Sequence, residues 1–416
     1  MTKILIVNFG GRFNKGGVAL VNSMIETIKY FIPNCKFTAL AHQANYNQYP
    51  IKVIETVGSN SSLKAGLKAL YLVVTSLLLM VFNRFGIRLN PRNEILREYV
   101  ESDAVINTGG DNLTEDYGTL SLAFNLSYLL IGLIFKKPVV IYAESIGPFR
   151  GRISRLMANF VLNRVNLITI REEISKKNLN LINVNKPRIC LTADSAFLLK
   201  AVTAKRLTEL LNTENITEND RPLVGISISK IISRYGFADI EKPEEKYQQY
   251  VSVMAKTIEY ITDNLEATVV IVPHVIDPRK NDDRWVADDV CKLISNKSKV
   301  ISIKEDYTPE ELKGIIGHCD LFIGARMHAT IASTSMLVPT IGIAYSHKIY
   351  GIVGEMLGQK EYILDVKELT YESLISKIDD VWKNRETIKE QLGIKVPQVK
   401  ERAMLNGKLV KELLSA

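Results

Sequence analysis

The chain has 416 residues, a length that predicts two domains of about 200 residues each rather than one. Hydrophobic residues make up 46% of it and charged residues 24%, which is ordinary globular usage and excludes a disordered or fibrous protein. The excess of 53 Lys and Arg over 45 Asp and Glu gives a formal charge of +8, which favours anionic partners such as phosphorylated substrates, acidic glycans or a membrane surface. We expect no nucleic-acid partner, because no basic run is interleaved with aromatic residues.

The cysteines are scattered, without the spacing of a metal site or a disulfide framework, so we expect free thiols and no bound metal. They are Cys35, Cys190, Cys291 and Cys319. The opening "MTKILIVNFGG" is typical of a short strand followed by a glycine loop rather than of a cleavable signal peptide, which favours a cytoplasmic protein.

Short β-branched runs alternate with longer helical patterns over the first 200 residues or so. The runs are "KILIVNF", "DAVINTGG", "PVVIYAESIG", "LITIR" and "RICLTADS". This alternation is typical of βαβ units and predicts a parallel sheet flanked by helices. Ligands of such sheets bind outside the carboxyl ends of the strands, so the residues that follow each run are the candidate site residues.

The first strand leads into "FGGRFNKGGVALVNSMI", residues 9–25, where paired glycines precede a helix. Backbone amides at a helix start can hold an anion or a sugar hydroxyl, which makes Gly16 and Gly17 candidate binding residues. A plain strand-to-helix turn is the alternative. The spacing is neither GxGxxG nor GxxxxGK[ST], so neither a dinucleotide site nor a P-loop is supported.

The segment "ALYLVVTSLLLMVF", residues 69–82, is almost wholly apolar and is flanked by Lys64, Lys68, Arg84 and Arg88. It is shorter than the roughly 20 residues needed to cross a bilayer. Two interpretations remain open: a buried core helix, or an interfacial helix in peripheral contact with a membrane.

Three further strand ends carry polar residues. "NTGGDNLTEDYG" contains Gly110 and Asp111, whose carboxylate either accepts a proton from a sugar hydroxyl or caps the following helix. "AESIGPF" places Glu144 at the next strand end. Arg171, directly after "LITI", either grips a carboxylate or phosphate with two parallel hydrogen bonds or forms a structural ion pair with Glu172 or a neighbour.

A polar stretch at 212–222 separates this series from a second one: "LVGISIS", "ATVVIVPH", "VISI", "DLFIGA" and "TIGIAY". We therefore place the domain boundary between about 200 and 222. The predicted organisation is an N-terminal domain at 1–205, a C-terminal domain at 206–366, and charged helices at 367–416 that pack across both. In the second series, His274 is a candidate ligand contact at a strand end.

The strongest candidate site is "DLFIGARMHATIAS", residues 320–333, which predicts a strand, a turn at Gly324 and a helix whose first turn carries Arg326 and His328. The helix amides and the guanidinium together favour an anion site. A histidine satisfied by local hydrogen bonds is the alternative for His328. After the next strand, Tyr345, Ser346 and Lys348 follow in "IAYSHK", and Lys348 could complete the anion pocket.

The order of motifs "NKGG…GGDNL…ESIGPF…TIREEIS…DSAF…VPH…ARMHATIAS…VPTIGIAYSHKIYGI" resembles the polysaccharide pyruvyl transferase family over roughly residues 3–360. The blocks "RMHATIAS" and "IAYSHK" are the most specific. The resemblance implies two Rossmann-like domains in a GT-B-like arrangement, phosphoenolpyruvate as donor and a pair of sugar hydroxyls as acceptor. It also implies a pyruvate ketal as product, with no metal or cofactor. The acceptor would be a sugar of a cell-surface polysaccharide or of its lipid-linked precursor.

Site roles follow from this resemblance. Arg326 and His328 match the family's Arg-x-His element, and Arg171 matches the arginine of its R-[DE]-x-x-S element. We assign His328 to deliver a proton, because an imidazole changes protonation near neutral pH. The residues assigned to the donor are Arg171, Arg326, Tyr345, Ser346 and Lys348. Those assigned to the acceptor are Asn14, Gly16, Gly17, Gly110, Asp111, Glu144 and His274, with Asp111 accepting the hydroxyl proton. Family members often carry an acidic residue in an N-x-G-D pattern, where Gly17 stands here.

Two rival functions remain. GT-B glycosyltransferases and epimerases that use nucleotide sugars commonly carry E-A-x-x-x-G-x-P, whose glutamate holds the donor's ribose. Aligning that pattern on Pro339 puts Ala332 at the glutamate and Leu337 at the glycine, so the main polar contact is missing. The other rival is a noncatalytic partner in a polysaccharide assembly complex that docks on a membrane through 69–82; the full set of candidate charged residues argues against it.

Overall fold

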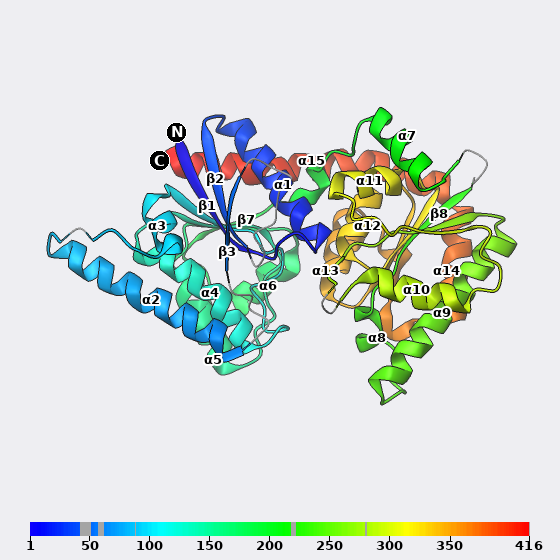
Figure 1. Ribbon diagram of the computed structural model, residues 1–416, viewed down its shortest axis with the longest axis horizontal. Coiled ribbons are helices and arrows are strands. Elements are labelled where there is room, and N and C mark those ends of the chain that lie inside the picture. Colours follow the sequence, from blue (N-terminus) through cyan, green and yellow to red (C-terminus); the bar gives the residue numbers. More distant parts are fainter. Residues whose placement is uncertain (42–50, 57–61, 88, 218–221, 279–280, 416) are drawn as a thin grey trace. The chain divides into compact units, whose positions relative to one another are not determined.

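The computed structural model describes residues 1–41, 51–56, 62–87, 89–217, 222–278 and 281–415 (Figure 1). The chain forms two compact units. The first comprises Met1–Arg12, Leu20–Ser195 and Glu401–Ala416, and the second comprises Phe13–Ala19 and Ala196–Lys400. The glycine loop at 13–19, which the sequence analysis placed in the N-terminal domain, therefore belongs to the second unit.

In the described part of the chain, the first unit contains a seven-stranded sheet in the order β3-β2-β1-β4-β5-β6-β7. All its strand pairs are parallel. The strands are β1 (Thr2–Phe9), β2 (Cys35–Ala41), β3 (Lys52–Glu55), β4 (Ala104–Asn107), β5 (Val139–Glu144), β6 (Leu167–Ile170) and β7 (Arg188–Leu191). The five predicted strands are present, and β2 and β3 are additional. Central strands such as β4 and β5 are buried along their whole length, which explains their unbroken apolar runs.

The helices of the first unit flank this sheet (Figure 1). They are α1 (Lys15–Phe31), α2 (Ser62–Arg84), α3 (Glu94–Glu101), α4 (Thr119–Ile134), α5 (Arg152–Leu162) and α6 (Glu173–Leu181). α2 is longer than the predicted 69–82 segment. Among the described residues, it alone is long and apolar enough to cross a membrane by length and composition. The buried-core interpretation of this segment is wrong for most of it, because only 22% of its most apolar window is buried.

The second unit contains, among its described residues, a six-stranded parallel sheet in the order β10-β9-β8-β11-β12-β13. The strands are β8 (Leu223–Ser227), β9 (Thr268–Ile271), β10 (Val300–Ser302), β11 (Leu321–Gly324), β12 (Thr340–Ala344) and β13 (Ile363–Asp365). Five were predicted, and β13 is additional. Because β8 lies between β9 and β11, the loops that leave these three strands start side by side at one edge of the sheet.

The helices of the second unit include long amphipathic ones and several short turns. They are α7 (Ala204–Thr213), α8 (Ile231–Tyr235), α9 (Pro243–Asn264), α10 (Asp283–Leu293), α11 (Pro309–Gly317), α12 (Met327–Ser335), α13 (His347–Ile349), α14 (Tyr371–Lys383) and α15 (Arg385–Ser415). The last segment of the chain is helical, as predicted, and α15 contributes residues to both units. All four cysteines are free thiols, which confirms the prediction.

Candidate functional site

The strand β11 ends at Gly324 and α12 begins at Met327, as the sequence predicts to within one residue. Arg326 is therefore the residue that precedes the helix, with an extended backbone, and His328 lies in its first turn. Gly324 is required because a Cβ there would lie 2.1 Å from the Thr330 hydroxyl oxygen. The backbone amides of Ala325 and Arg326 donate to Ser227 Oγ at 3.0 and 3.3 Å, so the turn is tied to the neighbouring strand β8.

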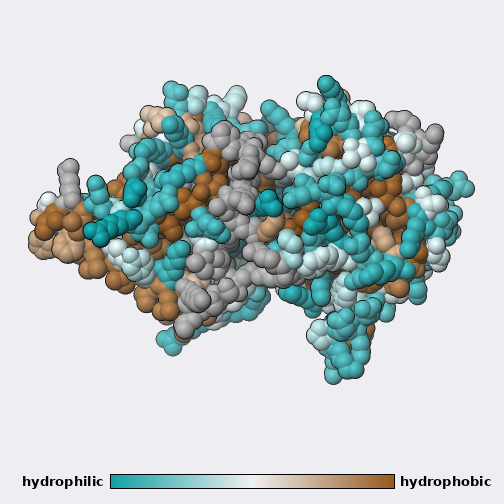
Figure 2. Space-filling view, in the orientation of Figure 1, coloured by the Kyte–Doolittle hydropathy of each residue, from teal (hydrophilic) through white to brown (hydrophobic). Residues whose placement is uncertain are grey.

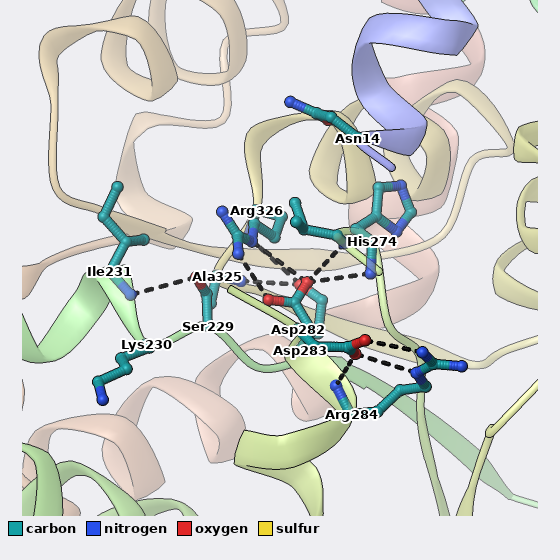
Figure 3. Close-up of polar contacts among 12 residues, drawn as sticks. Asn14, Ser229, Lys230, Ile231, His274, Asp282, Asp283, Arg284, Ala325 and Arg326 are labelled. Carbon is teal, nitrogen blue, oxygen red and sulfur yellow. Dashed lines mark hydrogen bonds and ion pairs between the residues drawn. The ribbon is translucent and has the colours of Figure 1, made fainter. Parts of the chain in front are cut away.

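The guanidinium of Arg326 is held by Asp283, the first residue of α10 (Figure 3). Arg326 Nη2 lies 2.6 Å from Asp283 Oδ1, and Nε donates to Oδ2 at 3.2 Å. The same Oδ2 accepts the backbone amides of His274 and Val275 at 3.1 and 2.8 Å. Asp283 is buried, so a single carboxylate fixes both the arginine and the loop after β9. The third guanidinium nitrogen points away from Asp283 (Figure 3).

The neighbouring Asp282 has a separate task. It caps α10 by accepting the amide of Arg284 at 3.0 Å, and its Oδ2 lies 2.7 Å from Arg284 Nη2. Of these two consecutive aspartates, Asp282 therefore caps the helix and Asp283 binds Arg326. Asp283 was not predicted from the sequence, where its only local signal is its place at a helix start.

His274 follows β9 and is buried beside this ion pair. Burial lowers its pKa to about 3, and the charges of His328, Arg326 and Lys15 act in the same direction. The imidazole of His274 is therefore neutral at physiological pH. Its Nδ1 is buried and has no hydrogen-bond partner within the part of the chain that the structure describes.

The glycine loop at 13–19 lies against the same residues. Asn14 forms a bridge with Val275, and the amide of Lys15 donates to the His274 carbonyl at 3.0 Å. Asn14 Oδ1 accepts the amides of Gly16 and Gly17 at 3.1 and 3.4 Å, which caps the start of α1.

Gly16 is the point of closest approach to His328. A Cβ on Gly16 would lie 2.2 Å from His328 Nδ1, so the imidazole packs directly on the glycine backbone and no other residue fits there. A Cβ on Gly17 would meet nothing within 4 Å. Gly16 is thus needed for the position of His328, whereas Gly17 has no such constraint.

The predicted residues after β12 lie at the same edge of the sheet, because β12 pairs with β11. Tyr345 is partly buried, stacks on Tyr235 with ring centroids 5.7 Å apart, and interacts electrostatically with Arg326. Ser346 precedes the short helix α13, and Lys348 is buried within it.

The remaining candidates belong to the first unit. Glu144 ends β5 and is completely buried; its Oε1 accepts the Gly109 amide at 2.6 Å and the side-chain amide of Asn107. Burial raises the pKa of Glu144 to about 8, although the Gly109 hydrogen bond and the charge of Arg171 oppose this shift. The carboxyl group is therefore largely protonated at neutral pH.

Arg171 is also completely buried. It forms an ion pair with Asp194, and its Nε donates to Ser145 Oγ at 2.8 Å. The alternative of a structural ion pair with Glu172 or a neighbour is therefore confirmed, but the partner is Asp194. Glu172 instead caps α6 by accepting the amide of Ser175 at 2.9 Å. In the described structure, Arg171 Nη2 is buried without a hydrogen-bond partner.

Asp111 lies in the loop between β4 and α4, where its Oδ2 accepts the Tyr117 hydroxyl at 2.8 Å. The alternative that Asp111 caps the next helix is wrong, because α4 begins at Thr119 and Gly118 occupies the cap position. Gly110 adopts a left-handed backbone with φ of 77°, and the backbone there also interacts with Glu144.

The structure thus gathers Asn14, Gly16, His274, Arg326 and His328 in the second unit, and Gly110, Asp111, Glu144 and Arg171 in the first. A model of the polysaccharide pyruvyl transferase family matches residues 14–347, which include the Arg326–His328 element and the glycine loop. This chain belongs to the polysaccharide pyruvyl transferase family. The predicted family is confirmed.

A curated relative of this pyruvyl transferase family member is the amylovoran biosynthesis protein AmsJ of Erwinia amylovora. The two are 29% identical over 326 residues, which cover 77% of this chain and 74% of AmsJ. The fold is similar to those of UDP-GlcNAc 2-epimerase from Neisseria meningitidis bound to UDP-GlcNAc (TM-score 0.60, 13% identity) and of Anabaena HepE in complex with UDP-glucose (TM-score 0.58, 12% identity). Each similarity covers 100% of both chains. The predicted fold class, two parallel sheets flanked by helices of the GT-B type, is confirmed.

Proposed function

We propose that this transferase moves pyruvate from phosphoenolpyruvate to two hydroxyls of a sugar, in a cell-surface polysaccharide or its lipid-linked precursor, and releases phosphate. The product is a cyclic ketal. The observation that supports the proposal best is the position of His328. It lies in the first turn of α12, its ring packs on the backbone of Gly16, and its charge contributes to the lowered pKa of His274. The family match and the polysaccharide relative support it.

The reaction requires a group that donates a proton to the methylene carbon of phosphoenolpyruvate. A proton added to the methylene carbon of phosphoenolpyruvate makes a methyl group and leaves an oxocarbenium-like centre at the carbon that bears phosphate. One sugar hydroxyl attacks this centre and loses its proton. The bond between this carbon and the bridging oxygen of the phosphate then breaks, and phosphate leaves. The second sugar hydroxyl attacks the same carbon and closes the ketal ring. The two sugar hydroxyls release two protons. One replaces the proton that the donor group gave to the methylene carbon, and the other leaves on the phosphate.

In this scheme His328 donates the proton to the methylene carbon. Arg326 binds the carboxylate or phosphate of the donor through the nitrogen that Asp283 does not hold, and the first amides of α12 add to the positive potential. Lys348, Tyr345 and Ser346 line the neighbouring strand end. Because His274 is held neutral, it orients an acceptor hydroxyl without adding a second positive charge.

Glu144 and Asp111, two candidate residues, belong to the first unit. A protonated Glu144 can donate a hydrogen bond, and Asp111 accepts the hydroxyl proton. We propose that the reaction takes place in the cytoplasm at the inner face of the cell membrane, where a phosphorylated donor and a lipid-linked precursor meet.

The nucleotide-sugar alternative has a specific obstacle. The position that would hold the ribose carries Ala332, which is buried in α12 and offers no polar atom on its side chain. Leu337, at the position of the pattern's glycine, adopts a left-handed backbone with φ of 64°. The local backbone there takes the shape that glycine favours, but the ribose contact is absent.

The test is a reaction in heavy water with phosphoenolpyruvate and a lipid-linked oligosaccharide acceptor, followed by mass spectrometry of the glycan. We expect phosphate release that depends on the acceptor, and one deuterium in the methyl group of the new ketal. Consumption of a UDP-sugar with no phosphate release from phosphoenolpyruvate would support the nucleotide-sugar alternative and contradict the proposal.

A further inference from the structure

Helix α2 (Ser62–Arg84) has two apolar faces, only one of which is covered. Ala65, Ala69, Leu72 and Ser76 recur at helical spacing and are buried. The three apolar ones belong to the hydrophobic core of the first unit, where α2 packs against α4. A surface helix of a soluble domain carries polar residues on its opposite face.

The opposite face of α2 is apolar as well. Leu70 is 59% exposed and Leu78 is 54% exposed, which are values expected of polar surface residues. The exposed apolar residues of the helix are Leu67, Leu70, Tyr71, Val74, Leu77, Leu78, Met80, Val81 and Phe82. Figure 2 shows hydrophobic side chains gathered along α2. Phe85, Ile87 and Leu89 extend the exposed series beyond the helix. A continuous apolar surface of this kind marks an interaction site.

The charged residues in this part of the sequence are all of one sign. Between Thr56 and Asn93 the sequence contains no acidic residue, and it contains five basic ones: Lys64, Lys68, Arg84, Arg88 and Arg92. The bulk of the chain has nearly equal numbers of both signs, so this segment is distinct. Apolar residues flanked by basic ones favour the surface of a membrane that contains anionic lipids.

A cavity at the end of α2 adds a second observation. Its volume is about 930 Å³, and its apolar wall includes Leu79, Met80 and Phe135. Its basic wall consists of Arg84, Lys136 and Lys137. Lys137 donates to the Val100 carbonyl at 2.8 Å, and the side chains of Arg84 and Lys136 are exposed. Apolar and basic groups thus lie next to each other in this cavity, as the acyl chains and the headgroups of a bilayer do at its interface.

The alternatives fit these observations less well. A second copy of the chain on this face would bring the same basic residues together across a two-fold axis, which is unfavourable. A membrane-spanning α2 would have to leave α4 and expose the face of Ala65, Ala69 and Leu72 that completes the core. If the helix keeps its packing against α4 and lies in the plane of the membrane, its inner face contacts the core and its outer face contacts lipid.

We propose that α2 docks the protein on an anionic bilayer, with its outer face among the acyl chains and with Arg84, Lys136 and Lys137 facing headgroup phosphates. The proposal does not depend on the reaction proposed above, since it concerns residues outside both candidate clusters.

The test is co-sedimentation of the purified full chain with phosphatidylcholine vesicles, with and without phosphatidylglycerol. We expect binding at least about tenfold tighter to the anionic vesicles. The variant Leu70→Gln/Leu78→Gln should bind at least about tenfold more weakly, because each leucine contributes the burial of a whole apolar side chain. The matched control is Leu181→Gln/Ile394→Gln, whose residues are 77% and 66% exposed outside α2 and whose binding should be unchanged.

A second variant, Arg84→Gln/Lys136→Gln, should lose most of the preference for anionic vesicles while it keeps the weak binding to neutral ones. Release of bound protein by alkaline carbonate supports docking, whereas resistance to it would mean a spanning helix and overturn the proposal. The proposal would also be overturned if the wild-type protein did not bind vesicles and light scattering showed a dimer that depends on α2. Pyruvyl transfer to a water-soluble acceptor should be the same in all these variants, so failure of docking and failure of the proposed reaction are distinguishable.

Discussion

Two pairs of polar residues at strand ends, one pair in each unit, differ in their access to solvent. In the first unit Glu144 and Arg171 are completely buried, and each is bound by neighbours in the chain. In the second unit Arg326 and His328 are only partly buried. A polar residue at the end of a parallel strand therefore predicts a polar cluster, but the surrounding burial decides whether that cluster stabilises the fold or can meet a ligand. We expect substitutions of Arg326 and His328 to reduce mainly activity, and those of Glu144 and Arg171 to reduce mainly stability.

The largest expected effect is that of His328→Gln. Loss of a positioned proton donor should lower the rate of pyruvyl transfer by about 10²- to 10⁴-fold, with little change in the thermal unfolding temperature. His318→Gln, outside both clusters, is the control and should retain full activity. Normal activity of the His328→Gln enzyme would show that His328 is not the proton donor.

Arg171→Met should act on the fold. Removal of this guanidinium breaks the buried ion pair with Asp194, which costs about 3–5 kcal/mol. Urea unfolding measures the loss, and Arg152→Met on the exposed surface of α5 is the control. Normal stability combined with lost phosphoenolpyruvate binding would instead mean that Arg171 serves the donor, as the family resemblance implies.

The pair Gly16→Ala and Gly17→Ala compares two neighbouring glycines. The added methyl group at residue 16 must displace the His328 ring, and a misplacement of about 1 Å costs on the order of 10²-fold in rate. The methyl group at residue 17 meets nothing, so that variant should keep nearly full activity. Steady-state rates for the two proteins test whether the glycine requirement comes from the histidine, and equal losses would show that it does not.

The last comparison concerns the pH dependence of stability, whose slope should differ in sign between Glu144 and His274. The pKa of Glu144 is raised from 4.5 to about 8, so its contribution is complete below pH 4.5 and is lost as the pH rises through 8. The pKa of His274 is lowered from 6.5 to about 3, so its contribution is complete above pH 6.5 and is lost as the pH falls toward 3. Each slope is at most about 1.4 kcal/mol per pH unit.

The free energy of unfolding, measured by urea titration between pH 5 and 8, checks these slopes. Glu144→Gln should remove a fall in stability toward alkaline pH, and His274→Gln a fall toward acid pH. Two variants with the same slopes as the wild type would show that neither group titrates as its burial requires.

Much of the fold was predictable because central parallel strands are buried on both faces and read as unbroken apolar runs. The strands β2 and β3 were not predicted, since they lie toward one edge of the sheet and carry exposed lysines within their runs. The strand β13 has only three residues. The apolar run of α2 was evident, but its length was not, because the helix continues through Lys68 and Gly66, which do not read as apolar.

The site was predictable where one motif contained it, as in Arg326 and His328. Contacts between distant segments were not predictable. Asp283 binds Arg326 from the start of α10, and Gly16 contacts His328 from near the start of the chain. Neither contact leaves a local pattern in the sequence, because each depends on the order of strands in the folded sheet.

The central claim is that the donor binds at the start of α12 and that His328 acts on it after binding. Calorimetric titration of phosphoenolpyruvate into the wild type, Arg326→Gln and His328→Gln tests this most directly. We expect the wild type and His328→Gln to bind with similar affinity and Arg326→Gln to bind at least about tenfold more weakly. Undiminished binding by Arg326→Gln, or no binding by the wild type, would contradict it.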